Sequence, residues 1–292
     1  KRGLMMAVAE HALREGKSNA DTPAGTISSR EARCGLNQGV APVLSGKLKP
    51  EHIGMLGFSL MLAFGSATVL PAAAQAAGIV ADPTAPGNQR PTVLQSANGT
   101  PQVNIQTPSA GGVSVNQYQQ FDVNGQGAIL NNSRTNTPTQ IGGWIQGNPW
   151  LAGGEAKIIV NQINSSNPSL LNGYIEVAGR RAEVIMANPA GIQVNGGGFI
   201  NAAGVTLSSG TPVLNNGHLD GFRVRTGTVS INGQGLDASR SDYTRILAQA
   251  AQINAGIWGK ELQVITGRND IDAAGEHIAA SADHPTGNHP SA

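Results

Sequence analysis

The sequence predicts an all-β solenoid, in which very short strands coil around a narrow aliphatic core. Charged residues make up only 13% of the 292 residues and aromatic residues only 4%, whereas hydrophobic residues reach 39% and glycines number 39. Such a chain is too apolar for simple disorder and too poor in Phe, Tyr and Trp for a core built on aromatic side chains. A solenoid instead buries Val, Ile, Leu and Ala one layer at a time.

Residues 1–76 predict an extended signal peptide that is cleaved after Ala76. Lys47 and Lys49 precede the stretch HIGMLGFSLMLAFGSATVLPAAAQA, which carries no Asp, Glu, Lys or Arg. Its apolar centre is too short for a membrane span, and it ends in the small-residue pattern Ala-Gln-Ala that signal peptidase cleaves. The segment therefore predicts handling by the Sec machinery and signal peptidase. A membrane anchor or a buried helix is the alternative.

The part that follows the signal has a balanced charge and no thiol. It carries 11 Lys and Arg against 13 Asp and Glu, so no strong attraction to nucleic acid is expected. The single cysteine, Cys34, lies upstream of the cleavage site. Disulfides are available to exported proteins. Their absence fits either chance or a chain that must cross a second membrane unfolded, and both explanations stay open.

Ala77 to about Gln106 is polar and Pro-containing, and we expect an irregular lead-in segment there. The following sequence changes to apolar runs of about 4–6 residues broken by Gly and Asn, which is the length of strands. Apolar and polar residues alternate clearly in 174–177 and 228–231. Residues 281–292 are expected to form a polar tail.

One segment, SDYTRILAQAAQINAGIWG, is ambiguous. Ser241 could cap a short helix through Gln249. In contrast, Ile253, Ala255 and Ile257 alternate as they would in a strand.

An internal repeat, [V/I]-N-G-x-G, marks places where a strand must bend. A strand that ends in Asn-Gly turns with positive φ, which Asn tolerates and Gly prefers. Its recurrence fits a parallel coil that bends at similar places on successive rungs, where a rung is one full turn of the coil. The three copies are Val123-Asn124-Gly125-Gln126-Gly127, Val194-Asn195-Gly196-Gly197-Gly198 and Ile231-Asn232-Gly233-Gln234-Gly235.

Three Asn-Pro motifs recur within about forty residues. Asn in the first position and Pro in the second favour a type I turn, because Asn accepts a backbone hydrogen bond from two residues on and Pro sets φ. We expect all three to be tight corners between strands. They are Asn148-Pro149-Trp150-Leu151, Asn167-Pro168-Ser169-Leu170 and Asn188-Pro189-Ala190-Gly191-Ile192.

No catalytic, cofactor-binding or metal site is predicted. Gly233, Gly235 and Ala238 match a dinucleotide fingerprint in spacing, but the polar LDASRSDY that follows has no helical periodicity, so a turn is favoured. The histidines of the C-terminal segment match no helical metal pair; they are His277, His284 and His289. The aspartates are spread along the chain, with no convergent acid and base pair; those considered are Asp220, Asp237, Asp242, Asp270 and Asp272.

The stretch NPWLAGGEAKIIVNQINSSNPSLLNGYIEVAGRRAEVIMANPAGIQVNGGGFINAAGVTLSSGTP closely resembles the secretion domain of filamentous haemagglutinin and CdiA-like contact-dependent growth inhibition exoproteins. These are the exported members of bacterial two-partner secretion systems. The resemblance continues through GQGLDASRSDYTRILAQAAQINAGIWGKELQVITGRNDID and covers about Gly111 to Ile278. The upstream RGLMMAVAEHALREGKS looks like the family's extended signal-peptide region.

The resemblance implies a right-handed parallel β-helix over residues 77–280, with an N-terminal cap and a small antiparallel sheet outside the coil. It also implies a monomeric, non-enzymatic domain that the POTRA domains of an outer-membrane transporter recognise in the periplasm. The protein would then pass the outer membrane of a Gram-negative bacterium, to the cell surface or the medium. Folding there would help to draw the chain out.

The family's two motifs, N-P-N-L and N-P-N-G, select the candidate recognition residues. This chain has Trp150 in the third position of the first motif and Ala190 in the third position of the second. The changes favour the shape of the turn over a side chain in that position as what is recognised. The candidate residues are Asn148, Pro149 and Leu151, and Asn188, Pro189, Gly191 and Ile192.

Two alternatives from other classes stay open. A surface adhesin would bind a glycan or host receptor on the coil itself, and an exposed aromatic stripe would favour it. A β-helix polysaccharide lyase would need carboxylates clustered on one face. Family members continue for many hundreds of residues beyond this region. The chain is therefore expected to be a fragment, a truncated product or an isolated secretion domain of an adhesin or a toxin-delivery protein.

Overall fold

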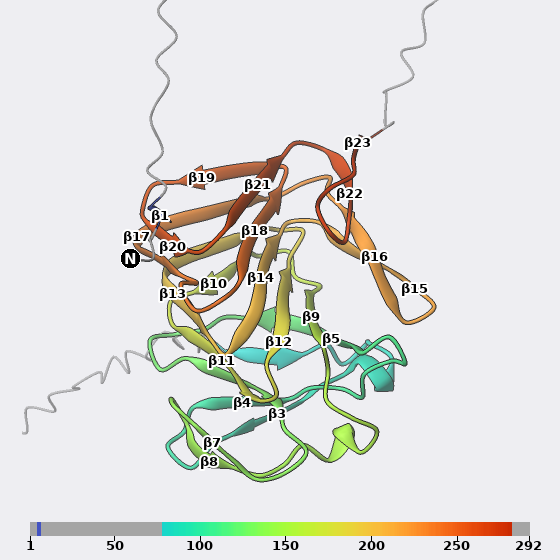
Figure 1. The fold of residues 1–292 in the computed structure, drawn as a ribbon, viewed down its shortest axis with the longest axis vertical. Helices are drawn as coiled ribbons and strands as arrows, with labels where there is room; N and C mark the ends of the chain where they lie inside the picture. The colour runs from blue at the N-terminus through green and yellow to red at the C-terminus, as the bar shows by residue number, and fades with distance from the viewer. Residues whose placement is uncertain (1–4, 7–77, 282–292) are drawn as a thin grey trace, which may run out of the picture. The chain divides into compact units, whose positions relative to one another are not determined.

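The computed structural model describes residues 5–6 and 78–281 (Figure 1). The predicted signal peptide, apart from Met5 and Met6, and the tail from residue 282 lie outside this part. Strands dominate the described residues, joined by two three-residue 3-10 helices, η1 (Gly87–Gln89) and η2 (Pro149–Leu151). Neither of these helices is long or apolar enough to cross a membrane.

One wall of the coil is a seven-stranded sheet, which we call the first sheet. Its strands pair in parallel from β5 to β21, and only β2 at its edge pairs antiparallel, with β5. In spatial order the strands are β2 (Ile79–Ala81), β5 (Val113–Phe121), β9 (Ile158–Ile163), β12 (Ala182–Ala187), β14 (Ala202–Ser208), β18 (Tyr243–Ala248) and β21 (Leu262–Thr266).

A ten-stranded second sheet forms the remaining walls. Its main path is β1 (Met5–Met6), β20 (Ile257–Gly259), β17 (Thr228–Asp237), β13 (Ile192–Ile200), β11 (Tyr174–Gly179), β6 (Ala128–Asn132), β4 (Pro101–Asn104) and β3 (Thr92–Gln95). Two further strands pair with the first halves of β13 and β17; they are β10 (Ser169–Leu171) and β19 (Ala250–Ile253). The second halves of β13 and β17 pair with β11 and β20. Each complete rung therefore has three faces.

The predicted corners are confirmed at the bend inside β13 and β17. The pairing register of these strands shifts between Asn195 and Gly197, and Gly196 and Gly233 have positive φ. The corner asparagines also join neighbouring rungs, because the Asn254 side chain donates to Asn232 at 2.9 Å. No helix opens after this corner, so the turn interpretation of the dinucleotide-like spacing holds.

Two sequence expectations about local structure are wrong, and one open choice is decided. Strands β5, β13 and β17 run to 9, 9 and 10 residues instead of 4–6, because β13 and β17 stay hydrogen bonded through their bend. The lead-in segment is not irregular, since β2 and the antiparallel pair β3–β4 line the edge of both sheets and bury Val103. Of the two structures left open after Ser241, a strand forms instead of a helix: Tyr243–Ala248 is β18, because parallel pairing with β14 and β21 outweighs a local cap.

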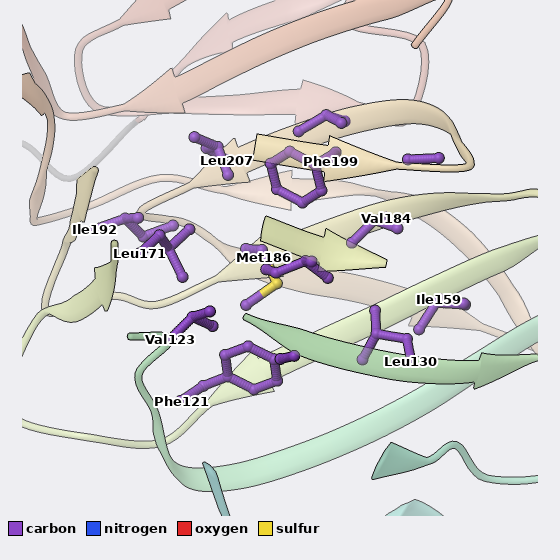
Figure 2. Close-up of a cluster of buried hydrophobic side chains, with 14 of the residues drawn as sticks. Phe121, Val123, Leu130, Ile159, Leu171, Val184, Met186, Ile192, Phe199 and Leu207 are labelled. Atoms are coloured by element: carbon purple, nitrogen blue, oxygen red, sulfur yellow. The ribbon is translucent and has the colours of Figure 1, made fainter. Parts of the chain in front are cut away.

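The interior of the coil is a continuous aliphatic core. Side chains from successive strands, among them Leu130, Met186 and Phe199, gather in one interior (Figure 2). Burying aliphatic side chains contributes about 1.5–3 kcal/mol for each one. Aromatic residues enter this core mainly at its N-terminal end, where Tyr118 and Phe121 pack edge to face with ring centroids 4.9 Å apart.

A second apolar layer lies outside the first sheet. A four-stranded antiparallel sheet stands beside the coil (Figure 1), and its Phe222 and Ile271 pack against Val160, Ile185 and Leu247 of the first sheet. Its strands are β15 (Thr211–Asn215), β16 (His218–Arg223), β22 (Asn269–Asp272) and β23 (Ile278–Ala280). This sheet, the cap and the parallel coil confirm the predicted fold class.

A hairpin covers part of the second sheet. It consists of β7 (Thr137–Thr139) and β8 (Gly143–Ile145), and the backbone of the loop between them is held by a carboxylate. The Glu176 side chain accepts hydrogen bonds from the N–H groups of Gln140 and Ile141 at 2.8–3.0 Å. The hairpin therefore rests on the outer face of β11.

The corner glycines provide the first prediction. Gly127 has φ +86°, and a Cβ there would lie 2.6 Å from the Tyr174 carbonyl oxygen. We expect Gly127→Ala to lower the free energy of unfolding by about 1–3 kcal/mol, the cost of a strained backbone position. Gly125 of the same corner has open space and serves as the control, because Gly125→Ala should change stability by about 0.5 kcal/mol or less. Urea unfolding followed by circular dichroism measures both, and equal midpoints would contradict the strain argument.

Candidate functional site

The second Asn-Pro turn is built around a fully buried asparagine. Asn188 follows β12, and its side-chain oxygen accepts the N–H of Ala190 at 2.9 Å while its carbonyl accepts the N–H of Gly191 at 2.9 Å. This is the predicted Asn-Pro β-turn. The side-chain amide donates to the Asn167 carbonyl and the Ser169 hydroxyl, each at 3.0 Å. Asn188 therefore closes its own turn and ties it to the preceding rung.

The first Asn-Pro turn repeats this design at another corner. The side-chain oxygen of Asn148 accepts the N–H of Trp150 at 3.0 Å, and its carbonyl accepts the N–H of Leu151 at 3.2 Å. Its side-chain amide donates to the carbonyls of Ile105 and Asn131 at 2.8 and 3.0 Å. Asn148 is 2% exposed and Asn188 is 0% exposed. Both side chains thus satisfy backbone groups inside the protein, as buried polar groups require.

The third motif is not built in this way. Asn167 is exposed, and the N–H of Leu170, which a type I turn would direct to the Asn167 carbonyl, donates to Asp122 at 2.8 Å. The Asn167 carbonyl instead accepts the amide of Asn188. The expectation of three equivalent turns is wrong, because contacts between rungs decide which Asn-Pro step closes on itself.

Two of the remaining motif residues are buried in the core, and a third is a glycine that the backbone conformation requires. Leu151 and Ile192 are fully buried in the interior of the coil. Gly191 has φ +117°, and a Cβ there would lie 2.6 Å from the Thr228 carbonyl oxygen. These residues position the turns and offer little surface to a partner.

The exposed part of the turns lies in their middle positions. Pro149 and Trp150 are exposed, Trp150 by 44%, while Pro189 and Ala190 are half-buried. The Trp150 indole N–H donates to the Thr92 hydroxyl at 3.2 Å, which orients the ring over β3. Trp150, which the family motif did not select, is thus the largest accessible side chain of the two turns.

The structure does not join the two turns into one site. The first lies between the β7–β8 hairpin and β9, and the second lies between β12 and β13. Their asparagines bond to different residues. A partner that contacts both must therefore cover an extended surface.

Sequence reasoning missed an acidic groove on the sheet outside the coil. Asp220, Asp270, Asp272 and Glu276 line it, because β16 and β22 pair antiparallel. Two of these carboxylates already interact with a basic side chain of the protein. The Asp270 side chain lies 2.8 Å from the Arg225 guanidinium, and Asp272 accepts the His277 ring nitrogen at 2.9 Å. The pairing of β16 with β22 brings these carboxylates together, and it joins segments far apart in the sequence. The alternation of apolar and polar residues in ELQVITGRNDID indicates strands there, but it does not indicate which strands pair.

The same histidine and aspartate show the main pKa shifts in this groove. The hydrogen bond to Asp272 raises the pKa of His277, and that bond lowers the pKa of Asp272. Within the described residues, no group of three or more His, Cys, Asp or Glu side chains is arranged to hold a metal ion. The other two histidines of the predicted tail, His284 and His289, lie outside the described residues.

Comparison with known proteins gives one family. The model of the TPS secretion domain matches residues 77–292. The toxin CdiA of Yersinia pestis is 49% identical over 281 residues, covering 96% of this chain and 8% of that protein. The tRNA nuclease CdiA-2 of Burkholderia pseudomallei strain 1026b is 40% identical over 290 residues, covering 98% of this chain and 9% of that protein. The chain thus spans less than a tenth of the length of these relatives.

A solved structure agrees with these matches. The crystal structure of the filamentous hemagglutinin secretion domain superposes with a TM-score of 0.63 at 35% identity, covering 70% of this chain and 68% of that one. The predicted resemblance to secretion domains of this kind is confirmed.

The buried asparagines provide the second prediction. Asn188→Ala removes the partner of the Ala190 N–H, the Asn167 carbonyl and the Ser169 hydroxyl. A buried polar group without a partner costs about 1–3 kcal/mol, so we expect a loss of about 2–4 kcal/mol in the free energy of unfolding. Asn167→Ala changes an exposed side chain and should cost about 0.5 kcal/mol or less. Chemical unfolding of the two variants compares them, and similar losses would show that burial does not set the cost.

Proposed function

This chain belongs to the TPS secretion domain family, and we propose that the POTRA domains of a dedicated outer-membrane transporter recognise it and that it starts β-helix folding at the cell surface. Relatives with this domain include CdiA toxins. We propose a binding module rather than an enzyme. The tRNA nuclease named in one relative would belong to a part of that protein beyond the matched region.

The two ends of the coil support the folding role. At the N-terminal end, β2 and the β3–β4 pair lie across the edges of the sheets. At the C-terminal end, Val264 of β21 continues the column of Ile246 but is 40% exposed, whereas Ile246 is fully buried. An uncovered strand at this end is a template on which a following rung docks, so folding can propagate in one direction.

The exposed middle of each Asn-Pro turn supports the recognition role. Buried asparagines hold both turns rigid, and Pro149, Trp150 and Pro189 lie at least partly in solvent above them. Trp is enriched among the residues that dominate protein interfaces. We propose that the transporter recognises the shape of these turns together with the Trp150 ring.

Export to the transporter requires passage through the inner membrane first. We propose that residues 1–76 direct this step through the Sec machinery and are removed by signal peptidase after Ala76. The domain then occupies residues 77–280, and the mature protein reaches the cell surface or the medium. The outer-membrane step uses no nucleotide in this scheme, because docking of successive rungs draws the chain outward.

The third prediction tests recognition separately from folding. Trp150→Ala should weaken binding of the purified chain to the POTRA region of the transporter encoded beside its gene by about fivefold or more, which corresponds to about 1 kcal/mol. Stability should fall by no more than about 1 kcal/mol, because the ring is 44% exposed. Trp258→Ala, at the other end of the coil, is the matched control. Titration calorimetry measures the affinities.

Two outcomes would reject this assignment. Unchanged affinity of the Trp150→Ala variant would remove the first turn from the recognised surface. No binding by a chain that circular dichroism shows to be folded β would reject transporter recognition itself.

A further inference from the structure

A single column of side chains crosses the outer face of the second sheet. The pairing register places Tyr174 of β11 beside Gly198 of β13, Gly198 beside Asp237 of β17, and Asp237 beside Trp258 of β20. Their sequence neighbours, such as Ile175, point into the core, so this column points outward. Two aromatic residues therefore stand on either side of one glycine and one carboxylate.

This column lines a groove of about 450 Å³, which lies in the range of small-molecule sites. Its lining residues are Tyr174, Gly196, Gly197, Gln234, Asp237, Ser239 and Trp258. The glycines leave the backbone bare between the aromatic rings. A Cβ on Gly198 would lie 2.4 Å from the Tyr174 ring, and one on Gly235 would lie 2.9 Å from the Trp258 ring. Both rings therefore cover glycine positions, where no other side chain would fit.

The carboxylate of Asp237 is oriented but not fully used. One of its oxygens accepts the N–H and the hydroxyl of Ser239 at 3.1 and 2.7 Å, and the other accepts the Tyr174 hydroxyl at 2.9 Å. A carboxylate has about four acceptor positions, so one remains for a ligand. Partial burial acts to raise the pKa of Asp237, but the bonds from Ser239 and Tyr174 hold it below its usual value. The group is therefore charged at neutral pH.

The chemistry of the groove excludes several kinds of ligand. A peptide cannot add as a strand, because β13 and β17 are paired on both sides here. Asp237 lines the groove and would repel an anion there, whereas the cation that acts on it, Arg240, is not among the lining residues. A purely apolar molecule would strip water from the carboxylate without replacing it. The groove therefore suits a molecule with an apolar face and several hydroxyl donors, in reach of Asp237 and the Gln234 amide.

We propose that this groove binds a pyranose ring of a neutral glycan. One C–H face of the sugar stacks on Trp258 or Tyr174, and a hydroxyl donates to the free position of Asp237. A hydrogen bond to an ionised carboxylate is stronger than one between neutral groups. The site lies on the outer face of the second sheet, and its last side chain, Trp258, belongs to β20 at the C-terminal end of the coil. It is a function beyond transporter recognition, and it uses none of the Asn-Pro turn residues.

The test begins with simple sugars. The purified chain is titrated with methyl β-D-glucopyranoside, methyl β-D-galactopyranoside and N-acetylglucosamine, with saturation-transfer NMR and tryptophan fluorescence as readouts. We expect at least one of them to bind with a Kd of about 1 mM, the affinity of a small site with one stacked face and a few hydrogen bonds. Saturation transfer should be strongest to the ring protons of the stacked face.

Substitutions in the groove test whether the sugar binds there. Trp258→Ala and Asp237→Asn should each weaken binding about tenfold. Asn at 237 keeps an oxygen for Ser239, so folding is preserved. Tyr174→Phe keeps the ring, loses the hydrogen bond to Asp237 and should weaken binding severalfold. Trp144→Ala, which removes a tryptophan that is 71% exposed on the β7–β8 hairpin, is the matched control and should bind as the parent chain does.

Clear results would overturn the proposal. The glycan site is rejected if no pyranoside binds the folded chain at about 50 mM, far above the expected Kd. It is also rejected if binding survives in both Trp258→Ala and Asp237→Asn, or is lost equally in Trp144→Ala. Transporter binding of the Trp258→Ala variant, measured in parallel, separates failure of this site from failure of the secretion function.

Discussion

Every rung of this protein depends on parallel pairing with the rung before it. A solenoid has contacts only between neighbours, so each rung must bend where the previous one bends or the pairing is lost. The corner at Asn195 to Gly197 lies on the corner at Asn232 to Gly235, and the glycines supply the positive φ that this bend needs. Buried asparagines tie the Asn-Pro turns to neighbouring chain segments in another way, because their side-chain amides donate to the backbone carbonyls of Ile105, Asn131 and Asn167.

This constraint explains why most side chains of the two Asn-Pro motifs are buried. Asn148, Asn188, Leu151 and Ile192 have their side chains inside the protein, where they set the position of the turns. The surface of the turns that is accessible to a partner is formed chiefly by Pro149 and Trp150. Under the proposed function, the motif links folding and recognition. Residues that fix the turn cannot change without loss of stability, whereas the exposed ones can change at little cost to the fold.

The two sheets use their outer faces differently. The first sheet is apolar on both sides, and the β15–β16 hairpin with β22 covers its outer side. The second sheet is partly covered by the β7–β8 hairpin, through Glu176, and elsewhere is open along the column from Tyr174 to Trp258. Small glycines in that column keep the surface hollow. The open face is therefore where a ligand can reach the coil without disturbing its pairing.

The fold class, the glycine-rich corners and the family could all be predicted from the sequence. Short apolar runs, glycine-rich corners and few aromatic residues indicate a thin aliphatic coil, and these signals are local. The segment before residue 106 and the third Asn-Pro turn were mispredicted, and the choice between helix and strand after Ser241 stayed open, because contacts with distant strands decided each of them. Only the tertiary structure showed that Asn188 is buried and Trp150 exposed. It alone brought Tyr174, Asp237 and Trp258 together, since their register follows from three strand pairings between residues far apart in the chain.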